Sequence, residues 1–170
     1  YRRQRQMCIR DRFCTNAICV PSRASILTGQ YSHVNGVYNL PDALDPDSLN
    51  VAKILKNNGY QTSIVGKWHL KKEPSGFDYY KVLPGQGLYN DPYFKTKENW
   101  EDGSRGGKKE KGFSADIIGD SSIEWLKKID NTRPFFLMTH FKATHEPFDY
   151  PERNKDLNKN MVFPEPSSLY

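Results

Sequence analysis

The sequence predicts an α/β fold, a partial open and mostly parallel sheet flanked by helices. Two apolar runs, 60–66 (YQTSIVG) and 135–140 (FFLMTH), have the composition of buried strands, and each follows a helix-like segment, 46–58 and 114–129. A helix, a short turn and a buried strand in that order are typical of such sheets. The chain has 170 residues, 36% of them hydrophobic, which is the size of one domain with a single core.

The first expected element is a short helix that begins at Pro21. Proline suits the first helical position, because its missing N–H would have had no partner there. Residues 22–27 tolerate a helix, and Gly29 is typical of a left-handed cap at its end. Cys19 would then lie just before the exposed N–H groups of the helix, with Arg23 one turn away. Such a position favours binding of an anion.

A second helix is predicted to open at 46–48 (PDS) and to end at Gly59. Its apolar side chains follow the helical period and are Leu49, Val51, Ala52, Ile54 and Leu55. The strand over 60–66 comes next. Beyond it, we expect 79–82 and 93–95 to pair as a hairpin, and 103–112 (GSRGGKKEKG) to be a solvated surface loop.

The last helix is predicted to be capped by Ser114 and to be broken at 131–134 (NTRP). Its inner side is expected to carry Ile118, Trp125, Leu126 and Ile129. The buried strand over 135–140 follows, and its order after the earlier strand and the helix suits parallel pairing.

The net charge of +5 does not indicate a nucleic-acid partner. Residues 1–12 (YRRQRQMCIRDR) hold five arginines and one aspartate, so they supply +4 of that charge. We expect these residues to be a non-native or artefactual segment and 13–170 to be part of a single domain. No RNA-binding motif and no run of membrane-spanning length is present in the sequence.

Candidate functional residues follow the two predicted strands directly. Lys67 and His69 lie after the first, and Lys142 and His145 lie after the second. In an open α/β sheet, functional groups gather outside the carboxyl ends of the strands. We therefore expect these side chains to meet near Cys19. The remaining histidines, His33 and His140, are assigned to packing or solvent.

The segment 19–29 (CVPSRASILTG) resembles the signature of the type I sulfatases, members of the alkaline-phosphatase superfamily. In that family the cysteine is oxidised to Cα-formylglycine. Two further segments are similar to family segments: 66–69 (GKWH), and 141–148 (FKATHEPF), in which Thr144 stands where the family usually has proline. The resemblance covers Phe13 to about Pro151 and leans toward N-acetylglucosamine-6-sulfatase-like enzymes.

Other interpretations of the cysteine are less consistent with its surroundings. A lone cysteine near a helix start is usually a small buried hydrophobic residue. A tyrosine-phosphatase loop needs arginine six residues after the cysteine, and position 25 is Ser25. A zinc site through Cys8, Cys14, Cys19 and His33 has the spacing of no common structural site.

The resemblance assigns roles by motif position. Position 19, as hydrated formylglycine, would attack the sulfate ester, and Arg23 and Lys67 would offset its charge. His69 would serve as a base, and His145 would protonate the leaving oxygen. Lys142 would bind the substrate.

The family also implies one Ca²⁺ ion held by oxygen ligands. Of its ligands, only position 19 can be matched in this sequence, and the others are expected outside it. Asp42, Asp45 and Asp47 are interpreted as loop and helix-cap residues. We expect this partial sulfatase catalytic domain, 13–170, to bind calcium poorly and to be inactive by itself.

The resemblance implies hydrolysis of sulfate monoesters, with a sulfated carbohydrate or another sulfate ester as substrate. It further implies the formylglycine-generating enzyme as a partner during maturation, and a periplasmic or secreted location. Two alternatives stay open: a phosphonate or phosphate ester hydrolase of the same superfamily, and a non-catalytic protein that binds sulfated glycans.

Overall fold

The computed structural model describes residues 14–165 and has a three-stranded parallel sheet at its centre. The strands are β1 (Gln61–Lys67), β2 (Tyr79–Leu83) and β5 (Phe135–His140), in the order β2-β1-β5. In their register, Ser63 lies opposite both Tyr79 and Leu137. The predicted α/β class and the parallel pairing are thus confirmed. The expectation for residues 1–12 lies outside the described residues.

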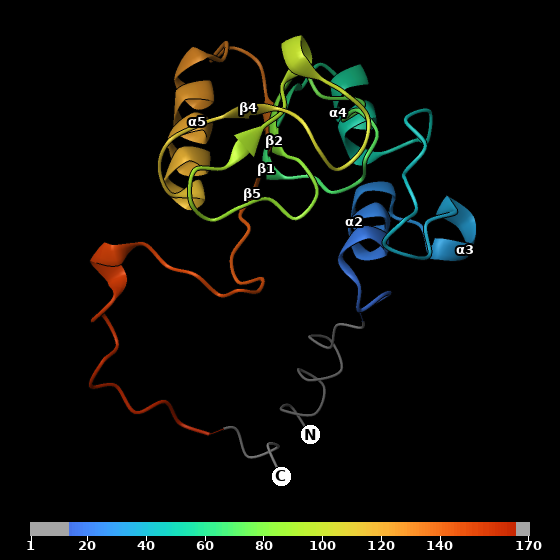
Figure 1. Cartoon of the computed structure of the whole chain (residues 1–170). Coiled ribbons are helices and arrows are strands. Elements are labelled where there is room, and N and C mark those ends of the chain that lie inside the picture. The colour runs from blue at the N-terminus through green and yellow to red at the C-terminus, as the bar shows by residue number, and fades with distance from the viewer. Residues whose placement is uncertain (1–13, 166–170) are drawn as a thin grey trace, which may run out of the picture.

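Helices cover both faces of this sheet, as Figure 1 shows. Helix α5 (Ser114–Lys128) packs through Ile118 against Val65 and Leu83 on one face. Helices α2 (Cys19–Thr28) and α4 (Val51–Asn57) pack on the other face, against alternate residues of the same strands. This alternation is the two-residue period of a strand. The remaining elements are α3 (Ser32–Asn35), β3 (Tyr93–Phe94), η1 (Lys97–Asn99), β4 (Lys108–Lys109) and η2 (Glu152–Asn154).

Helix boundaries differ from those predicted. Helix α2 begins at Cys19, two residues before Pro21, and ends at Gly29, whose φ of 69° is left-handed as expected. Helix α4 begins at Val51 because the side chain of Asn50, not Ser48, accepts a hydrogen bond from the Lys53 N–H, at 3.0 Å. A proline or serine near a helix start is therefore only a weak guide to its first residue.

The predicted hairpin between 79–82 and 93–95 is wrong. Strand β2 joins the central sheet, and only Val82 pairs with Lys95, as an isolated bridge. Strand β3 pairs instead with β4, which lies inside the segment 103–112 that was expected to be a loop.

Two details of α5 and β5 also differ. Phe113 occupies the cap position of α5, and Ser114 is its first helical residue. Leu126 is 36% exposed, and the buried side of the helix carries Ser121 and Ser122 with Ile118. Strand β5 is half-buried rather than buried, and in the described part of the chain it lies at an edge of the sheet.

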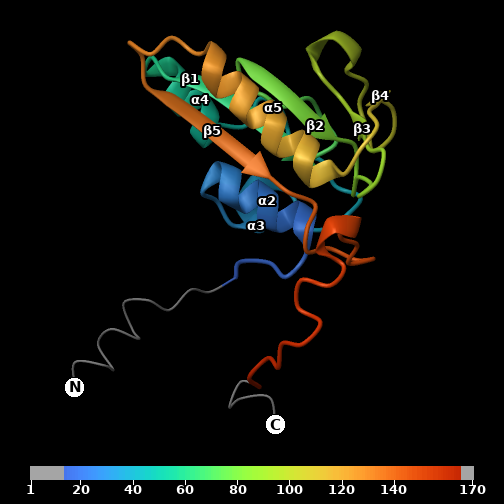
Figure 2. The same ribbon diagram turned by 90° about the vertical axis from the view of Figure 1, so that its left-hand side faces the viewer.

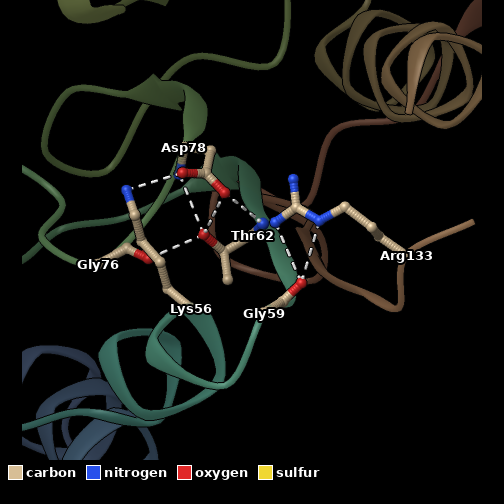
Figure 3. Close-up of polar contacts among 6 residues, drawn as sticks. All are labelled: Lys56, Gly59, Thr62, Gly76, Asp78 and Arg133. Carbon is tan, nitrogen blue, oxygen red and sulfur yellow. Dashed lines mark hydrogen bonds and ion pairs between the residues drawn. The ribbon is translucent and has the colours of Figure 1, made fainter. Parts of the chain in front are cut away.

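A polar network ties together the amino ends of the strands, and Figure 3 shows it. The Asp78 carboxylate accepts a hydrogen bond from the Thr62 N–H at 3.0 Å and pairs with Lys56 at 2.7 Å. Arg133, just before β5, donates to the Gly59 carbonyl, with the Nη2 atom at 3.1 Å. These contacts fix the starts of β1, β2 and β5 relative to α4, which leaves the carboxyl ends to form a site. Within residues 14–165, no helix is both long and apolar enough to span a bilayer.

Gly66 lets β1 and β5 approach closely at their carboxyl ends. Its φ is 105°, and a Cβ at this position would overlap the carbonyl oxygen of His140. Only glycine accommodates both the backbone conformation and the contact. Gly66 therefore determines how closely the residue after it, Lys67, lies to the end of β5.

Gly66→Ala is expected to lower the free energy of unfolding by about 3 kcal/mol, from left-handed strain and overpacking. Urea unfolding of the protein measures this change. Gly119→Ala is the matched control, because a Cβ there meets no atom within 4 Å and Gly119 lies inside α5. The control should be neutral or slightly stabilising. Equal stability of the Gly66 variant and the wild type would contradict the prediction.

Candidate active site

The predicted residues meet where the carboxyl ends of the strands face the start of α2. Lys67 is the last residue of β1, and Cys19 is the first residue of α2. Figure 2 shows α2 lying beside β5. His69 follows β1 with a left-handed φ of 61°, which is uncommon for a residue with a side chain. This conformation accompanies the approach of its ring to Cys19.

Cys19 is half-buried and has two polar neighbours. Its Sγ lies 3.4 Å from the Nδ1 atom of His69. On another side, the Nε2 group of Gln86 donates to Sγ at 3.8 Å. A group at position 19 thus has a titratable ring and an amide donor within contact.

Arg23 connects α2 to both strands. Its Nη1 group donates to the Lys67 carbonyl at 2.7 Å and lies 3.1 Å from Nδ1 of His140, which accepts. Burial, followed by the charge of Arg23, lowers the pKa of His140, which keeps its ring neutral and able to accept. The assignment of His140 to packing or solvent is therefore wrong, because this histidine orients Arg23.

Lys67 is a buried cation, with 3% of the residue exposed. Its Nζ group donates to the Oε1 atom of Gln86. Burial, followed by the charge of Arg23, lowers the pKa of Lys67 to about 8. The Lys67 amine is therefore still mostly protonated at pH 7, and no carboxylate within residues 14–165 forms an ion pair with it. The positive charge of Lys67 is therefore available to pair with an anion that enters the site.

His69, unlike Lys67, is uncharged at neutral pH. Burial, followed by the charges of Lys67 and Arg23, lowers its pKa to about 4. The ring is therefore neutral at pH 7, and one of its nitrogens can accept a proton from a group at position 19.

The loop after β5 forms the rim of the site. Lys142 is buried, and its Nζ group donates to the Gln86 carbonyl at 3.4 Å and lies 4.8 Å from the centre of the Tyr89 ring. His145 is half-buried, with its Nδ1 atom 2.9 Å from the Glu146 carbonyl. The Tyr89 hydroxyl donates to the His145 carbonyl and so holds this rim.

The structure therefore brings Cys19, Arg23, Lys67 and His69 into one set of contacts. Lys142 joins this set through Gln86, while His145 stays on the rim. A pocket of about 420 Å³ opens beside Cys19 and Arg23, and its other lining residues are Ser22, Ile26, Leu27, Trp68, Leu70, Met138, Thr139, His140, Phe141 and Ala143.

Sequence reasoning missed Gln86. This residue lies three positions after β2, in the turn 84–87 (PGQG). Functional groups follow the ends of parallel strands, but the predicted hairpin placed 79–82 outside the parallel sheet, and residue 86 therefore did not count as a strand-end position. The signal was present, and the wrong pairing of β2 concealed it.

The side chains around Cys19 do not fit a calcium ion by themselves. Calcium prefers several oxygen ligands, often carboxylates. Here Cys19 contacts a histidine ring and one amide, the charged groups nearby are the cations Arg23 and Lys67, and no cluster of three or more His, Cys, Asp or Glu side chains between residues 14 and 165 could hold a metal. Asp42 and Asp45 accept backbone hydrogen bonds within their own loop.

Comparisons with known proteins agree with this arrangement. The sequence model of the family described as Sulfatase matches residues 2–161. The chain is 42% identical over 161 residues to the N-acetylglucosamine-6-O-sulfatase of Bacteroides thetaiotaomicron, covering 93% of this chain and 28% of that protein. It is 31% identical over 151 residues to the ulvan-active sulfatase of Formosa agariphila, covering 82% of this chain and 29% of that protein.

A solved structure, that of BT4656 in complex with its substrate D-glucosamine-2-N,6-O-disulfate, superimposes with a TM-score of 0.82. The two are 38% identical, and the match covers 93% of this chain and 31% of the other. The chain thus spans less than a third of the length of these relatives.

Gln86→Ala is expected to lower the free energy of unfolding by about 1–3 kcal/mol at pH 7, because the buried Lys67 ammonium loses its side-chain acceptor. The loss should shrink above the Lys67 pKa of about 8, where the neutral amine needs that acceptor less. Urea unfolding at pH 7 and pH 9.5 tests both statements. Gln30→Ala, at an exposed glutamine, is the control. An equal loss at the two pH values would contradict the role of the ammonium.

Proposed function

The chain belongs to the sulfatase family, and we propose that the whole protein hydrolyses sulfate monoesters of a carbohydrate. The observation that carries this proposal is the arrangement around Cys19 at the carboxyl edge of the sheet. His69 contacts the thiol, Lys67 is connected to it through Gln86, and Arg23 lies one turn along α2 and binds the Lys67 carbonyl. Because two of the relatives act on or bind 6-sulfated glucosamines, a 6-O-sulfated glucosamine is the substrate that we favour.

The charge of the site suits a sulfate ester. The ester carries one negative charge spread over its free oxygens. Fixed cations placed next to these oxygens stabilise that charge during the reaction. Two such cations lie near residue 19, Arg23 on α2 and Lys67 at the end of β1. Lys142 adds a third cation on the far side of Gln86. Aligned in advance, these groups favour the transition state without reorganisation.

We propose that Cys19 is converted to formylglycine by the formylglycine-generating enzyme. Hydrated formylglycine would supply a nucleophilic oxygen, and a second hydroxyl that allows the sulfate to be released afterwards. His69, neutral at pH 7 and 3.4 Å from Sγ, accepts the proton from the hydroxyl at position 19. Gln86 orients that group through its amide.

His145 is the candidate proton donor to the leaving oxygen. Its Nδ1–H donates to the Glu146 carbonyl, so the proton passed to the leaving oxygen is the second one, which the imidazolium form carries on Nε2, and the ring is left neutral. The lysine of the rim, Lys142, would bind the substrate beside it. Calcium binding by the whole protein is also proposed, with position 19 as the one ligand that this chain contributes, and so is a periplasmic or secreted location.

Cys19→Ala is expected to reduce turnover of N-acetylglucosamine 6-sulfate by the whole protein about 10³-fold or more, because the nucleophile is lost. Cys14→Ala is the matched control, since the Cys14 thiol is exposed and donates within its own loop to Asn16. Mass spectrometry of the peptide that contains residue 19 should show an aldehyde in place of the thiol. Turnover that survives in the Cys19 variant would refute the proposal, and preference for a paired phosphonate ester would favour the alternative hydrolase.

His145→Ala is expected to reduce turnover of a sugar sulfate about 10²–10⁴-fold, but to affect 4-nitrophenyl sulfate much less, because nitrophenolate leaves without protonation. His33→Ala provides the control, as His33 is exposed and stacks on Tyr31. The ratio of the two rates in each variant is the measurement. An equal loss on both substrates would exclude proton donation by His145.

A further inference from the structure

A second pocket opens next to Gln86. It has a volume of about 420 Å³, and its lining residues are Pro84, Gln86, Gly87, Leu88, Tyr93, Ser104, Arg105, Gly106 and Gly107. Gln86 also contacts Cys19 and Lys67, so one residue separates this pocket from the candidate nucleophile. We call it the Arg105 pocket. A substrate whose sulfate reaches Cys19 could extend into it.

The lining combines apolar surface with a free cation. Tyr93 is 40% exposed and Leu88 is 52% exposed, so both present carbon surface to solvent. Arg105 is exposed beside them. An aromatic ring packs against the C–H face of a sugar, and a guanidinium binds a carboxylate or sulfate with two parallel hydrogen bonds. The lining chemistry therefore matches an acidic or sulfated sugar.

A buried lysine holds the wall that carries Arg105. Lys95 is 1% exposed, and its Nζ group donates to the carbonyls of Glu101 and Gly103 and lies 4.9 Å from the centre of the Trp100 ring. Its backbone pairs with Val82 of β2. A lysine so fully removed from water serves the loop rather than a reaction, since its donors are used by main-chain carbonyls. The wall is thus anchored to the central sheet.

The chain segment that supplies Arg105 to the pocket wall has an excess of positive charge. The segment 104–111 contains one acid, Glu110, and four cations, Arg105, Lys108, Lys109 and Lys111. Glu110 pairs with Lys81 at 2.8 Å, and Lys109 approaches Asp91 at 4.0 Å. Among the described residues, the other three cations form no ion pair, and all three are exposed. An anionic ligand would be attracted to this segment.

We propose that the Arg105 pocket is a second substrate subsite, which holds an anionic sugar joined to the sugar whose sulfate lies at Cys19. Arg105 binds the carboxylate or sulfate of that neighbouring sugar, and Tyr93 contacts its ring. The proposal rests on the proposed function, because it takes the group at Cys19 to be the sulfate of a carbohydrate. It assigns to the lysine-rich segment 104–111 a role in attracting an anionic glycan.

Binding to the whole protein carrying Cys19→Ala, in which the substrate is not consumed, tests the subsite. The ligands are a heparin tetrasaccharide and the monosaccharide glucosamine 2-N,6-O-disulfate, and isothermal titration calorimetry gives both affinities. Adding Arg105→Ala should weaken tetrasaccharide binding about tenfold, the loss of one charge-assisted contact, and should leave monosaccharide binding unchanged. Lys127→Ala, which removes an exposed cation from the last turn of α5, is the control and should change neither affinity.

Arg105→Lys distinguishes the two parallel hydrogen bonds of the guanidinium from the effect of its positive charge alone. It keeps the positive charge but loses the planar fork, so it should restore only part of the tetrasaccharide affinity. The subsite is overturned by a wild-type-like tetrasaccharide affinity in Arg105→Ala, by an equal loss for both ligands, or by an equal loss in Lys127→Ala. Turnover by the protein with Cys19 intact is read separately. Its absence refutes the sulfatase proposal, while the affinities still decide whether the pocket binds an anionic sugar.

Discussion

The site depends on one hydrogen-bonded junction, in which the Arg23 guanidinium joins the Lys67 carbonyl and the His140 ring. These residues come from α2, β1 and β5, and they are separated by 44 to 117 positions along the chain. The junction fixes the start of α2 against the carboxyl ends of two strands. Together with the apolar packing of α2 against the sheet, the junction keeps Cys19 within contact of His69.

The same arrangement places positive charges close together in a partly buried site, which opposes stability. Burial, followed by repulsion from Arg23, lowers the pKa of Lys67, and burial, followed by the charges of Lys67 and Arg23, lowers the pKa of His69 and keeps its ring neutral. A protein selected for stability alone would place a carboxylate among these cations. The described chain places only the Gln86 amide there, a group that orients without neutralising. The uncompensated charge is therefore the clearest mark of function in the fold.

Most of the fold and much of the site could be predicted from sequence, for identifiable reasons. Apolar runs and glycine punctuation located β1, β5 and α5, and the strand-end rule located Lys67, His69, Lys142 and His145. The rest depended on tertiary contacts. The partner of β2 is decided by distant segments, so a local hairpin was the wrong prediction, and Gln86 was lost with it. His140 ends a strand as an ordinary residue, and only the approach of Arg23 gives it a role.

Among residues 14–165, strand β5 pairs on one side only. Its outer N–H and C=O groups are accompanied by Phe135 and Phe141, each more than 40% exposed. An unpaired strand edge with apolar side chains recruits other strands. A polypeptide of these residues produced alone would therefore be prone to self-association through β5. Such a polypeptide should be kept at low concentration, and its oligomeric state should be measured by size-exclusion chromatography before it is assayed.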